Sequence, residues 1–128
     1  IEERGTPKAK LVAKYNPKKK SFFVFKPKGY YLVKTIERVN TPENLLILIR
    51  PRSTLIRSGL MSITGYVAPG YQGELVFGIK NLGLCEAKIE LGARIVHIMF
   101  FEIKGKSALY RGQWQGGRVS THKKEKQI

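Results

Sequence analysis

The sequence predicts an all-β domain, either a sandwich or a barrel, that contains one short helix. Apolar residues come in short runs, turn-forming residues separate these runs at near-regular spacing, and one segment carries helix-capping residues at both ends. Several short strands between turns are typical of all-β sandwiches and barrels. A chain of 128 residues fits one domain, so residues 1–128 are expected to share one core.

Seven runs are expected to form strands, because each is short, apolar and bounded by turn residues such as Gly, Pro and Asn. In chain order they are Leu11–Ala13, Phe22–Phe25, Tyr30–Ile36, Leu45–Ile49, Leu75–Ile79, Ala87–Leu91 and Ile95–Phe101. Leu45–Ile49 is apolar at every position, which predicts a central strand with both faces covered.

The segment Ser53–Leu60 breaks the strand pattern and predicts a two-turn helix. A hydroxyl residue suits its start and Gly59 suits its end. Free backbone N–H groups at the helix start would lie beside Arg52, Ser53 and Thr54, and this combination can bind a phosphate group. An ordinary capped helix is the alternative interpretation.

Two further segments have a composition that suits ligand binding. Gly65–Gly73 contains a Pro-Gly turn with glycines at both ends, which predicts a hairpin that presents backbone groups to a flat ligand, or a plain hairpin. Tyr110–Thr121 combines aromatic, amide, arginine and glycine residues. That composition fits a flexible lid or a disordered basic tail.

The net charge is +15, from 24 Lys and Arg against 9 acidic residues. The positive charge is concentrated near the two ends of the chain, at Lys8, Lys10, Lys14, Lys18, Lys19, Lys20, Arg118, Lys123, Lys124 and Lys126. Such a distribution attracts nucleic acid or nucleoside triphosphates equally well. A lysine-rich solvated surface of a heat-adapted protein is the other interpretation.

Several classes of protein are disfavoured by composition. The single Cys85 cannot form an internal disulfide, and one cysteine with two distant histidines is too few for a zinc site, so no metal ligands are predicted. No apolar run approaches the roughly 20 residues of a membrane span. The chain starts at Ile1 without a signal-like segment, so we expect a cytoplasmic protein whose basic N-terminal segment, 1–20, is trimmed rather than a targeting sequence.

Taken in order, these segments resemble the trimeric dUTPase and dCTP deaminase superfamily from about Phe25 to Ser120. Pro51-Arg52-Ser53-Thr54-Leu55 is similar to the family's phosphate motif, and Gly65–Gly73 is similar to its G-x-I-D-P-G-Y-x-G motif. Leu91–Ile95 and Tyr110–Gln113 resemble its later motifs. The resemblance implies a distorted jelly-roll β-barrel that forms a homotrimer with nucleotide sites between subunits.

The resemblance also implies roles for individual residues. The triphosphate, accompanied by Mg²⁺, would be held by Arg52, Ser53, Thr54 and Arg57. The base and sugar of a pyrimidine deoxynucleotide would be held by Gly65, Tyr66, Val67, Tyr71 and Gln113. A flexible C-terminal arm, 109–128, would close as a lid that includes Trp114 and Arg118.

The sequence departs from the family pattern at its catalytic positions. In dUTPases an aspartate orders the attacking water, and the matching residue here is Ala68, which cannot accept a proton. All nine acidic residues are Glu, so no aspartate can replace it, and Glu74 is a weak candidate base. Phe77-Gly78 lacks the deaminase glutamate, Leu109 replaces a lysine found in deaminases, and Ser62 stands at the uracil-reading Asn of many dUTPases.

Three functions therefore remain open. The first is a dUTP diphosphatase, or an inactive or substituted form in which Ala68 arose naturally or by design. The second is a non-catalytic relative that binds nucleotide, nucleic acid through its basic ends, or a protein partner. The third is a relative of dCTP deaminase.

Overall fold

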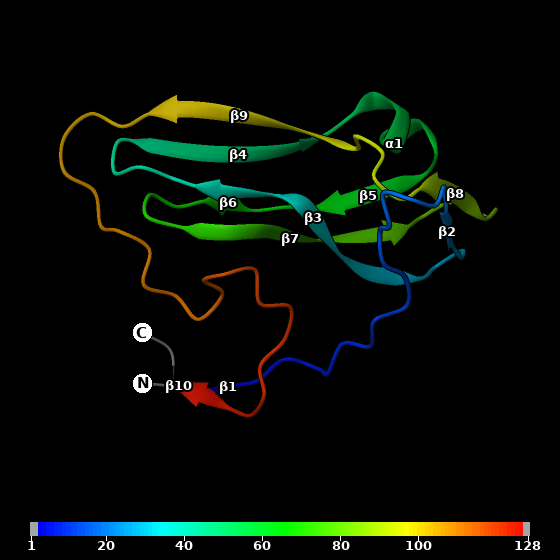
Figure 1. The fold of residues 1–128 in the computed structure, drawn as a ribbon, viewed down its shortest axis with the longest axis horizontal. Coiled ribbons are helices and arrows are strands. Elements are labelled where there is room, and N and C mark those ends of the chain that lie inside the picture. The colour runs from blue at the N-terminus through cyan, green and yellow to red at the C-terminus, as the bar shows by residue number, and fades with distance from the viewer. Residues whose placement is uncertain (1–2, 127–128) are drawn as a thin grey trace.

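The computed structural model describes residues 3–126, and its regular secondary structure is all β-strand apart from one short helix (Figure 1). The predicted all-β fold is therefore confirmed. The elements are β1 (Glu3–Arg4), β2 (Phe22–Phe25), β3 (Tyr30–Asn40), β4 (Leu45–Pro51), α1 (Ser53–Arg57), β5 (Leu60–Ile63), β6 (Tyr66–Val67), β7 (Gln72–Asn81), β8 (Ala87–Glu90), β9 (Val96–Glu102) and β10 (Glu125–Lys126).

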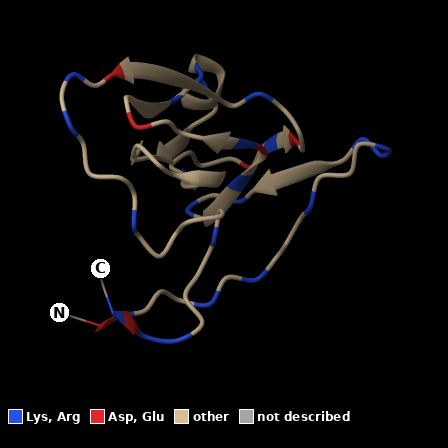
Figure 2. Ribbon diagram, turned by 60° about the vertical axis from the view of Figure 1, so that its left-hand side comes forward, with Lys and Arg blue, Asp and Glu red and all other residues tan. Residues whose placement is uncertain are grey.

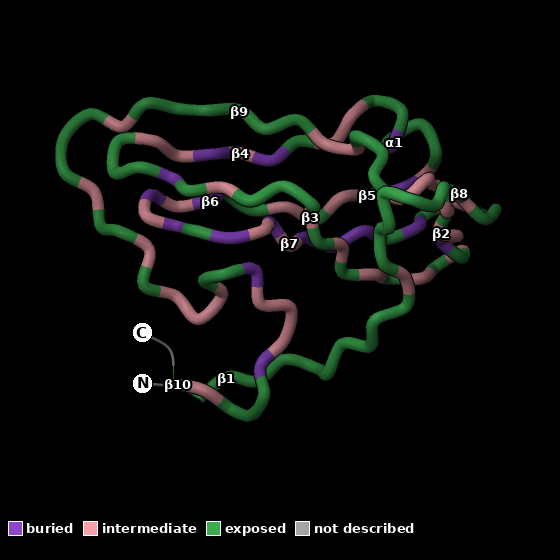
Figure 3. The backbone as a smooth tube through the Cα atoms, viewed as in Figure 1, coloured by how far each residue is buried: buried purple, intermediate pink, exposed green. Residues whose placement is uncertain are grey.

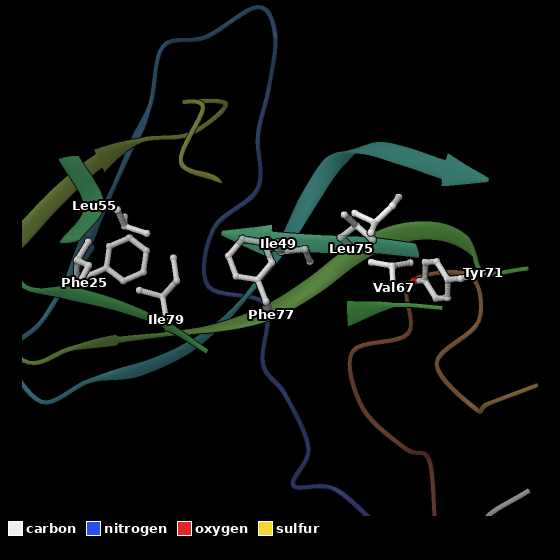
Figure 4. Packing of buried hydrophobic residues seen from close by; sticks show 10 residues of the cluster. Phe25, Ile49, Leu55, Val67, Tyr71, Leu75, Phe77 and Ile79 are labelled. Carbon is white, nitrogen blue, oxygen red and sulfur yellow. The ribbon is translucent and has the colours of Figure 1, made fainter. Parts of the chain in front are cut away.

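Two three-stranded sheets form the body of the molecule, with strand orders β3-β7-β5 and β6-β4-β9. Two strand pairs, β2-β8 and β1-β10, lie at its periphery, and every pairing is antiparallel. Apolar side chains fill the space between the sheets (Figure 4), where Ile49 of β4 lies near Leu75 and Phe77 of β7. Packing these inward faces together removes apolar surface from water and stabilises the sandwich.

The register of each strand determines which residues enter this core. In β7 the odd-numbered Leu75, Phe77 and Ile79 point inward and are at most 6% exposed. In β4 only Ile47 and Ile49 are fully buried, while Leu46 and Leu48 are half-buried (Figure 3). The predicted central position of β4 is confirmed, because β6 and β9 pair with its two edges.

Several elements differ from the prediction. Leu11–Ala13 forms no strand, and Leu11 and Val12 are 76% and 64% exposed, because the flanking lysines keep this segment in solvent. Helix α1 is shorter than the predicted two turns. Four short strands, β1, β5, β6 and β10, lie outside the seven predicted runs, since none is long enough for a clear alternating pattern.

The predicted hairpin at Gly65–Gly73 is wrong. Strand β6 pairs with β4, whereas β7 pairs with β3 and β5, so the two strands of the segment belong to different sheets. The Pro-Gly turn is present, but it carries the chain from one sheet to the other. Local turn residues could not distinguish these cases, because each strand finds its partner far away in the sequence.

Asn81 is a buried polar residue that connects three parts of the fold. It is 0% exposed, and its Nδ2 donates to the carbonyl oxygens of Phe25 at 2.8 Å and Cys85 at 2.9 Å. Its Oδ1 accepts from the Gly83 amide at 2.9 Å. A fully bonded amide of this kind fixes the end of β7 against β2 and the following turn.

Within residues 3–126, no helix combines the length and the apolar character needed to cross a membrane.

Replacing Asn81 by Leu should lower the free energy of unfolding by about 3 kcal/mol or more, because three backbone groups lose their buried partner. The matched control is the same change at Asn40, which is exposed at the end of β3 and should change stability by less than about 0.5 kcal/mol. Urea denaturation followed by circular dichroism measures both. Equal stabilities of the two variants would contradict this role of Asn81.

Candidate functional site

Arg52 lies at the turn between β4 and α1 and is fixed by the segment before β9. Its backbone amide donates to the Ile95 carbonyl at 3.0 Å, and its Nη1 donates to the Arg94 carbonyl at 3.2 Å. The guanidinium has five N–H donors, so several remain for an anion after this contact. The turn therefore presents an oriented positive charge at the end of the β6-β4-β9 sheet.

Helix α1 follows Arg52 directly and carries further polar side chains. Leu55 is 3% exposed and anchors the helix to the core, whereas Ser53, Thr54 and Arg57 are exposed. The residue at the helix N-cap is Arg52, not the predicted Ser53, and no side chain caps the helix start. The predicted glycine after the helix is confirmed, because Gly59 has a φ of 73°.

A shallow apolar groove runs beside α1, lined mainly by Pro51, Ile56, Leu60, Met61 and Leu82. Its apolar lining does not suit a phosphate group. Ser62 also borders it, and the Ser62 Oγ is buried without a hydrogen-bond partner among the described residues. This hydroxyl is therefore a polar group that a ligand or a neighbouring subunit could satisfy.

Ala68 begins a tight turn on the connection between β6 and β7. The Tyr71 amide donates to the Ala68 carbonyl at 3.3 Å, and Gly70 has a φ of 78°, which is the geometry of a type II turn. The Gly70 amide also donates to the Thr41 carbonyl at 2.7 Å. Position 68 is thus held firmly, but its methyl group offers neither a hydrogen bond nor a proton acceptor.

The three residues before this turn differ in their exposure to solvent. Gly65 is exposed, and a side chain added there would meet no atom within 4 Å. Tyr66 is 66% exposed, whereas Val67 is 7% exposed and points into the core. Only the backbone of Val67 is therefore available to a ligand.

The C-terminal arm, residues 109–126 of the described chain, packs on the start of β7. The Tyr110 amide donates to the Pro69 carbonyl at 2.7 Å, and the Gly116 amide donates to the Gln72 carbonyl at 2.8 Å. The Gln115 side chain accepts from the Gln72 amide at 3.0 Å and donates to the Gly70 carbonyl at 3.1 Å. The arm thus occupies backbone groups on both sides of the turn.

Gln115 was not among the predicted site residues, although its side chain bonds to the backbone of the turn at Gly70 and Gln72. The predicted Gln113 instead uses its backbone carbonyl to accept from Arg118 at 3.0 Å. Arg118 also forms a two-pronged ion pair with Glu125, with Nη2 to Oε1 at 2.7 Å, and this pairing raises the pKa of Arg118. A sequence pattern alone does not distinguish two glutamines two positions apart.

Tyr71 is covered by the arm. It is 8% exposed, its hydroxyl donates to the Glu74 carbonyl at 2.6 Å, and its ring packs edge-on against Tyr110 at 5.4 Å between centroids. Burial raises the pKa of this phenol. The Tyr71 ring becomes accessible to a ligand only when the arm shifts.

Glu74 is the acidic residue nearest in sequence to Ala68, and it is held by cations. Its carboxylate lies 3.1 Å from Arg38 Nη1 and 3.9 Å from Lys34 Nζ. A hydrogen bond from its own backbone amide, followed by the charges of Lys34 and Arg38, lowers its pKa. A carboxylate with a lowered pKa is a poorer general base at neutral pH.

Gly78, on the outward face of β7, lies beneath the ring of Tyr30. A side chain at position 78 would begin 2.6 Å from the Tyr30 hydroxyl, so this ring would have to move to admit an acid there.

The turns at Arg52 and Ala68 lie toward opposite ends of β4, whereas Tyr66 pairs with Leu48 in the middle of the strand. Arg52 follows the last residue of the strand, whereas Val67 pairs with Ile47 near its beginning, so Ala68 lies close to the level of Leu46. Six residues of extended strand span roughly 20 Å. Figure 1 shows the same separation, with α1 at one end of the sheets and the β6–β7 connection toward the other.

Comparison with known proteins places the chain in one family. The model of the dCTP deaminase-like family matches residues 2–103. The dCTP deaminase of Pyrococcus furiosus is 30% identical over 122 residues, which cover 94% of this chain and 76% of the relative. The dCTP deaminase of Thermococcus kodakarensis is 34% identical over 93 residues, covering 72% of this chain but only 60% of the relative.

Solved structures share the fold. The dUTPase of Staphylococcus bacteriophage 80alpha superposes with a TM-score of 0.60 at 20% identity, covering 84% of this chain and 92% of that one. An Asp-to-Asn variant of the dUTPase from phage phi11 of S. aureus, described with a structural Mg(II) ion, gives a TM-score of 0.56 at 19% identity over 70% of this chain and 76% of that one. At these identities the likeness concerns the fold.

The Glu74 carboxyl should titrate below its ordinary pKa, and replacing Arg38 by Gln should raise that pKa part of the way back. Because the folded-state pKa is lowered, this carboxylate stabilises the fold above its ordinary pKa, and the contribution is lost as the pH falls through the folded value. Carbon-detected NMR of labelled glutamate measures the titration. Changing Arg50, which lies on the other sheet, to Gln should leave the pKa of Glu74 unchanged. An equal shift of this pKa in both variants would contradict the role of Arg38.

Proposed function

Because the chain belongs to the dCTP deaminase-like family, we propose that it binds a pyrimidine deoxynucleoside triphosphate, dUTP or dCTP, at sites shared between the subunits of a homotrimer. The observation that carries this proposal is the separation of the two halves of the site. Arg52 and Ala68 lie at opposite ends of β4 in one chain, too far apart to surround one pyrimidine ring and its phosphates. A neighbouring copy can bring the missing half to each end.

At the phosphate half, the chain supplies donors without acidic competitors. Arg52 is oriented by the Arg94 carbonyl, and its free N–H groups suit two oxygens of a phosphate. The exposed hydroxyls of Ser53 and Thr54 would add hydrogen bonds, and Arg57 would add charge. No residue of α1 is acidic, so nothing in the helix repels the triphosphate.

Mg²⁺ would reach this site bound to the triphosphate. The described residues contain no group of three or more His, Cys, Asp or Glu that could hold a metal ion. Mg²⁺ commonly keeps several waters and binds through substrate phosphates, and the donor set here, guanidinium and hydroxyl groups, fits the phosphates of such a complex. The ion would neutralise part of the charge on the phosphate oxygens.

At the base half, Gly65 and Tyr66 would offer backbone groups to the pyrimidine edge, and Tyr71 would contact the sugar. The arm would close on the nucleotide by exchanging its present contacts, since Gln115 and Gly116 now occupy the backbone around the turn. Gln113, Trp114 and Arg118 would belong to the closed lid.

Binding rather than rapid hydrolysis is the activity that these residues support. Ala68 cannot activate water, and Glu74 is paired with Arg38 and Lys34. An Asp-to-Ala variant of the 80alpha dUTPase is described with dUpNHpp, so in that protein the loss of an aspartate is compatible with the bound analogue. We therefore infer a dUTP diphosphatase site that lacks its acid.

Deamination of dCTP is the second candidate function, favoured by the names of the curated relatives. It would require an acid near Gly78, where the ring of Tyr30 now lies. Chromatography of reactions with dCTP separates the two candidates, because deamination yields a uracil nucleotide and releases ammonia.

Replacing Arg52 by Ala should weaken binding of dUpNHpp with Mg²⁺ at least tenfold, because a charged hydrogen-bond donor contributes about 1.5 kcal/mol or more. Isothermal titration calorimetry measures the affinity. The matched control is Arg50→Ala, which removes an exposed arginine of β4 two residues away. This site would be refuted if the unaltered protein gave no heat of binding up to millimolar ligand. It would also be refuted if both variants lost the same affinity for dUpNHpp.

Replacing Ala68 by Asp should create measurable release of pyrophosphate from dUTP, at least about a hundredfold above the unaltered chain, because a positioned general base contributes 10²–10⁴ in rate. A coupled phosphate assay after pyrophosphatase treatment follows the reaction. Ala68→Asn, which has the same shape without a basic carboxylate, should stay near the original rate. An inert Ala68→Asp protein that still binds dUpNHpp would reject the diphosphatase assignment while leaving nucleotide binding intact.

A further inference from the structure

The two lysine-rich ends of the described chain lie side by side. Strand β1 pairs with β10, with Glu3 opposite Lys126 and Arg4 opposite Glu125. Beyond this pair, the Thr6 amide donates to Thr121 Oγ1 at 2.9 Å, and the Thr121 amide donates back to Thr6 Oγ1 at 3.0 Å. Thr121 is 5% exposed. These reciprocal bonds join segments that are 115 residues apart in the sequence.

This junction unites two separate groups of positive charge into one surface, which we call the basic strip. It consists of Lys8, Lys10, Lys14, Lys18, Lys19, Lys20, Lys123, Lys124 and Lys126, all of which are exposed. Figure 2 shows the lysines and arginines following the N-terminal segment from the paired ends toward β2. Beside the strip, Glu90 is paired with Lys20 and Glu125 with Arg118, and the exposed Glu3 lies opposite Lys126. Most of its charge is therefore free to meet an external anion.

The backbone and aromatic residues of the strip add a second feature. Residues 5–16 form no helix or strand and run as an extended segment over the surface. Tyr15 and Phe22 are 40% and 45% exposed, and the Lys88 ammonium lies 4.5 Å from the centre of the Phe22 ring. Lysines that contact phosphates, interleaved with aromatic rings on which bases can stack, are typical of surfaces that bind single strands.

We propose that the basic strip binds single-stranded nucleic acid, independently of the nucleotide site. The lysines contact the phosphate backbone, and Phe22 stacks on a base when the Lys20 and Lys88 ammonium groups, which now lie over its ring, turn to phosphates. An acidic protein segment would satisfy the charge but would make no use of the exposed rings. The strip shares the C-terminal arm with the proposed nucleotide site but contains none of the residues proposed to bind the nucleotide, so failure of one proposal leaves the other standing.

The test is fluorescence anisotropy of a labelled 20-nucleotide oligo(dT) across a series of salt concentrations. Each lysine that neutralises a phosphate of a single strand adds about 0.7 to the slope of log affinity against log salt. Changing Lys8 and Lys10 together to Gln should therefore reduce the slope by about 1.4. Changing Lys104 and Lys106 to Gln removes the same charge at the same spacing, off the strip on the segment after β9, and should leave the slope unchanged.

Two further variants distinguish base stacking on the strip from attraction between charges alone and from binding at Arg52. Phe22→Leu should weaken oligo(dT) binding at least about fivefold, the lower limit for a stacked base, without changing the affinity for inorganic polyphosphate. Arg52→Ala should leave oligo(dT) binding intact. Absence of binding near 0.1 M salt, equal slopes for the two lysine pairs, or equal competition by polyglutamate and oligo(dT) would each overturn the proposal.

Discussion

The backbone of β7 is hydrogen-bonded along both of its edges, to β3 on one side and to β5 on the other. Its hydrogen bonds hold its own sheet together, and its inward side chains fill the middle of the core and pack this sheet against the other one. The two ends of the strand also bind other segments of the chain. Asn81 fixes the last residue to β2 and the next turn, while Gln72 receives the C-terminal arm. A shift of β7 would therefore disturb the core, the turn at Ala68 and the arm at once.

The geometry of the candidate site follows from the length of β4. This strand separates the turn at Arg52 from the turn at Ala68 by nearly its whole length, and each turn is anchored by backbone bonds that leave little freedom to approach the other. One chain consequently carries two half-sites. In the proposed trimer, ligand binding and subunit association would be mutually dependent, because each subunit would complete a site that its neighbour begins.

The arm and the basic strip share a structural element. Residues 109–126 reach from the turn near Ala68 to the N-terminal segment, where Thr121 meets Thr6. Between these points Arg118 and Glu125 hold each other in an ion pair with good geometry. The N-terminal segment is thus positioned by the same arm that covers Tyr71, and for this reason the described ends of a basic chain lie together despite their like charge.

The sequence by itself determined the all-β class, the single helix, most strand positions and the residue types of the two turns. These features depend on local periodicity and on the conformational limits of Gly and Pro, as at Pro69-Gly70 and Gly59. It also placed Ala68 where the resemblance to dUTPases leads us to expect an aspartate. Tertiary structure decided which strands pair, because pairing is long-range: β6 joins β4 rather than β7. It also decided that Gln115 bonds to the backbone on both sides of the turn, that Tyr71 is covered, and that the two basic ends form one surface. In each case the deciding contact joins residues that are distant in sequence, and no local pattern encodes such a contact.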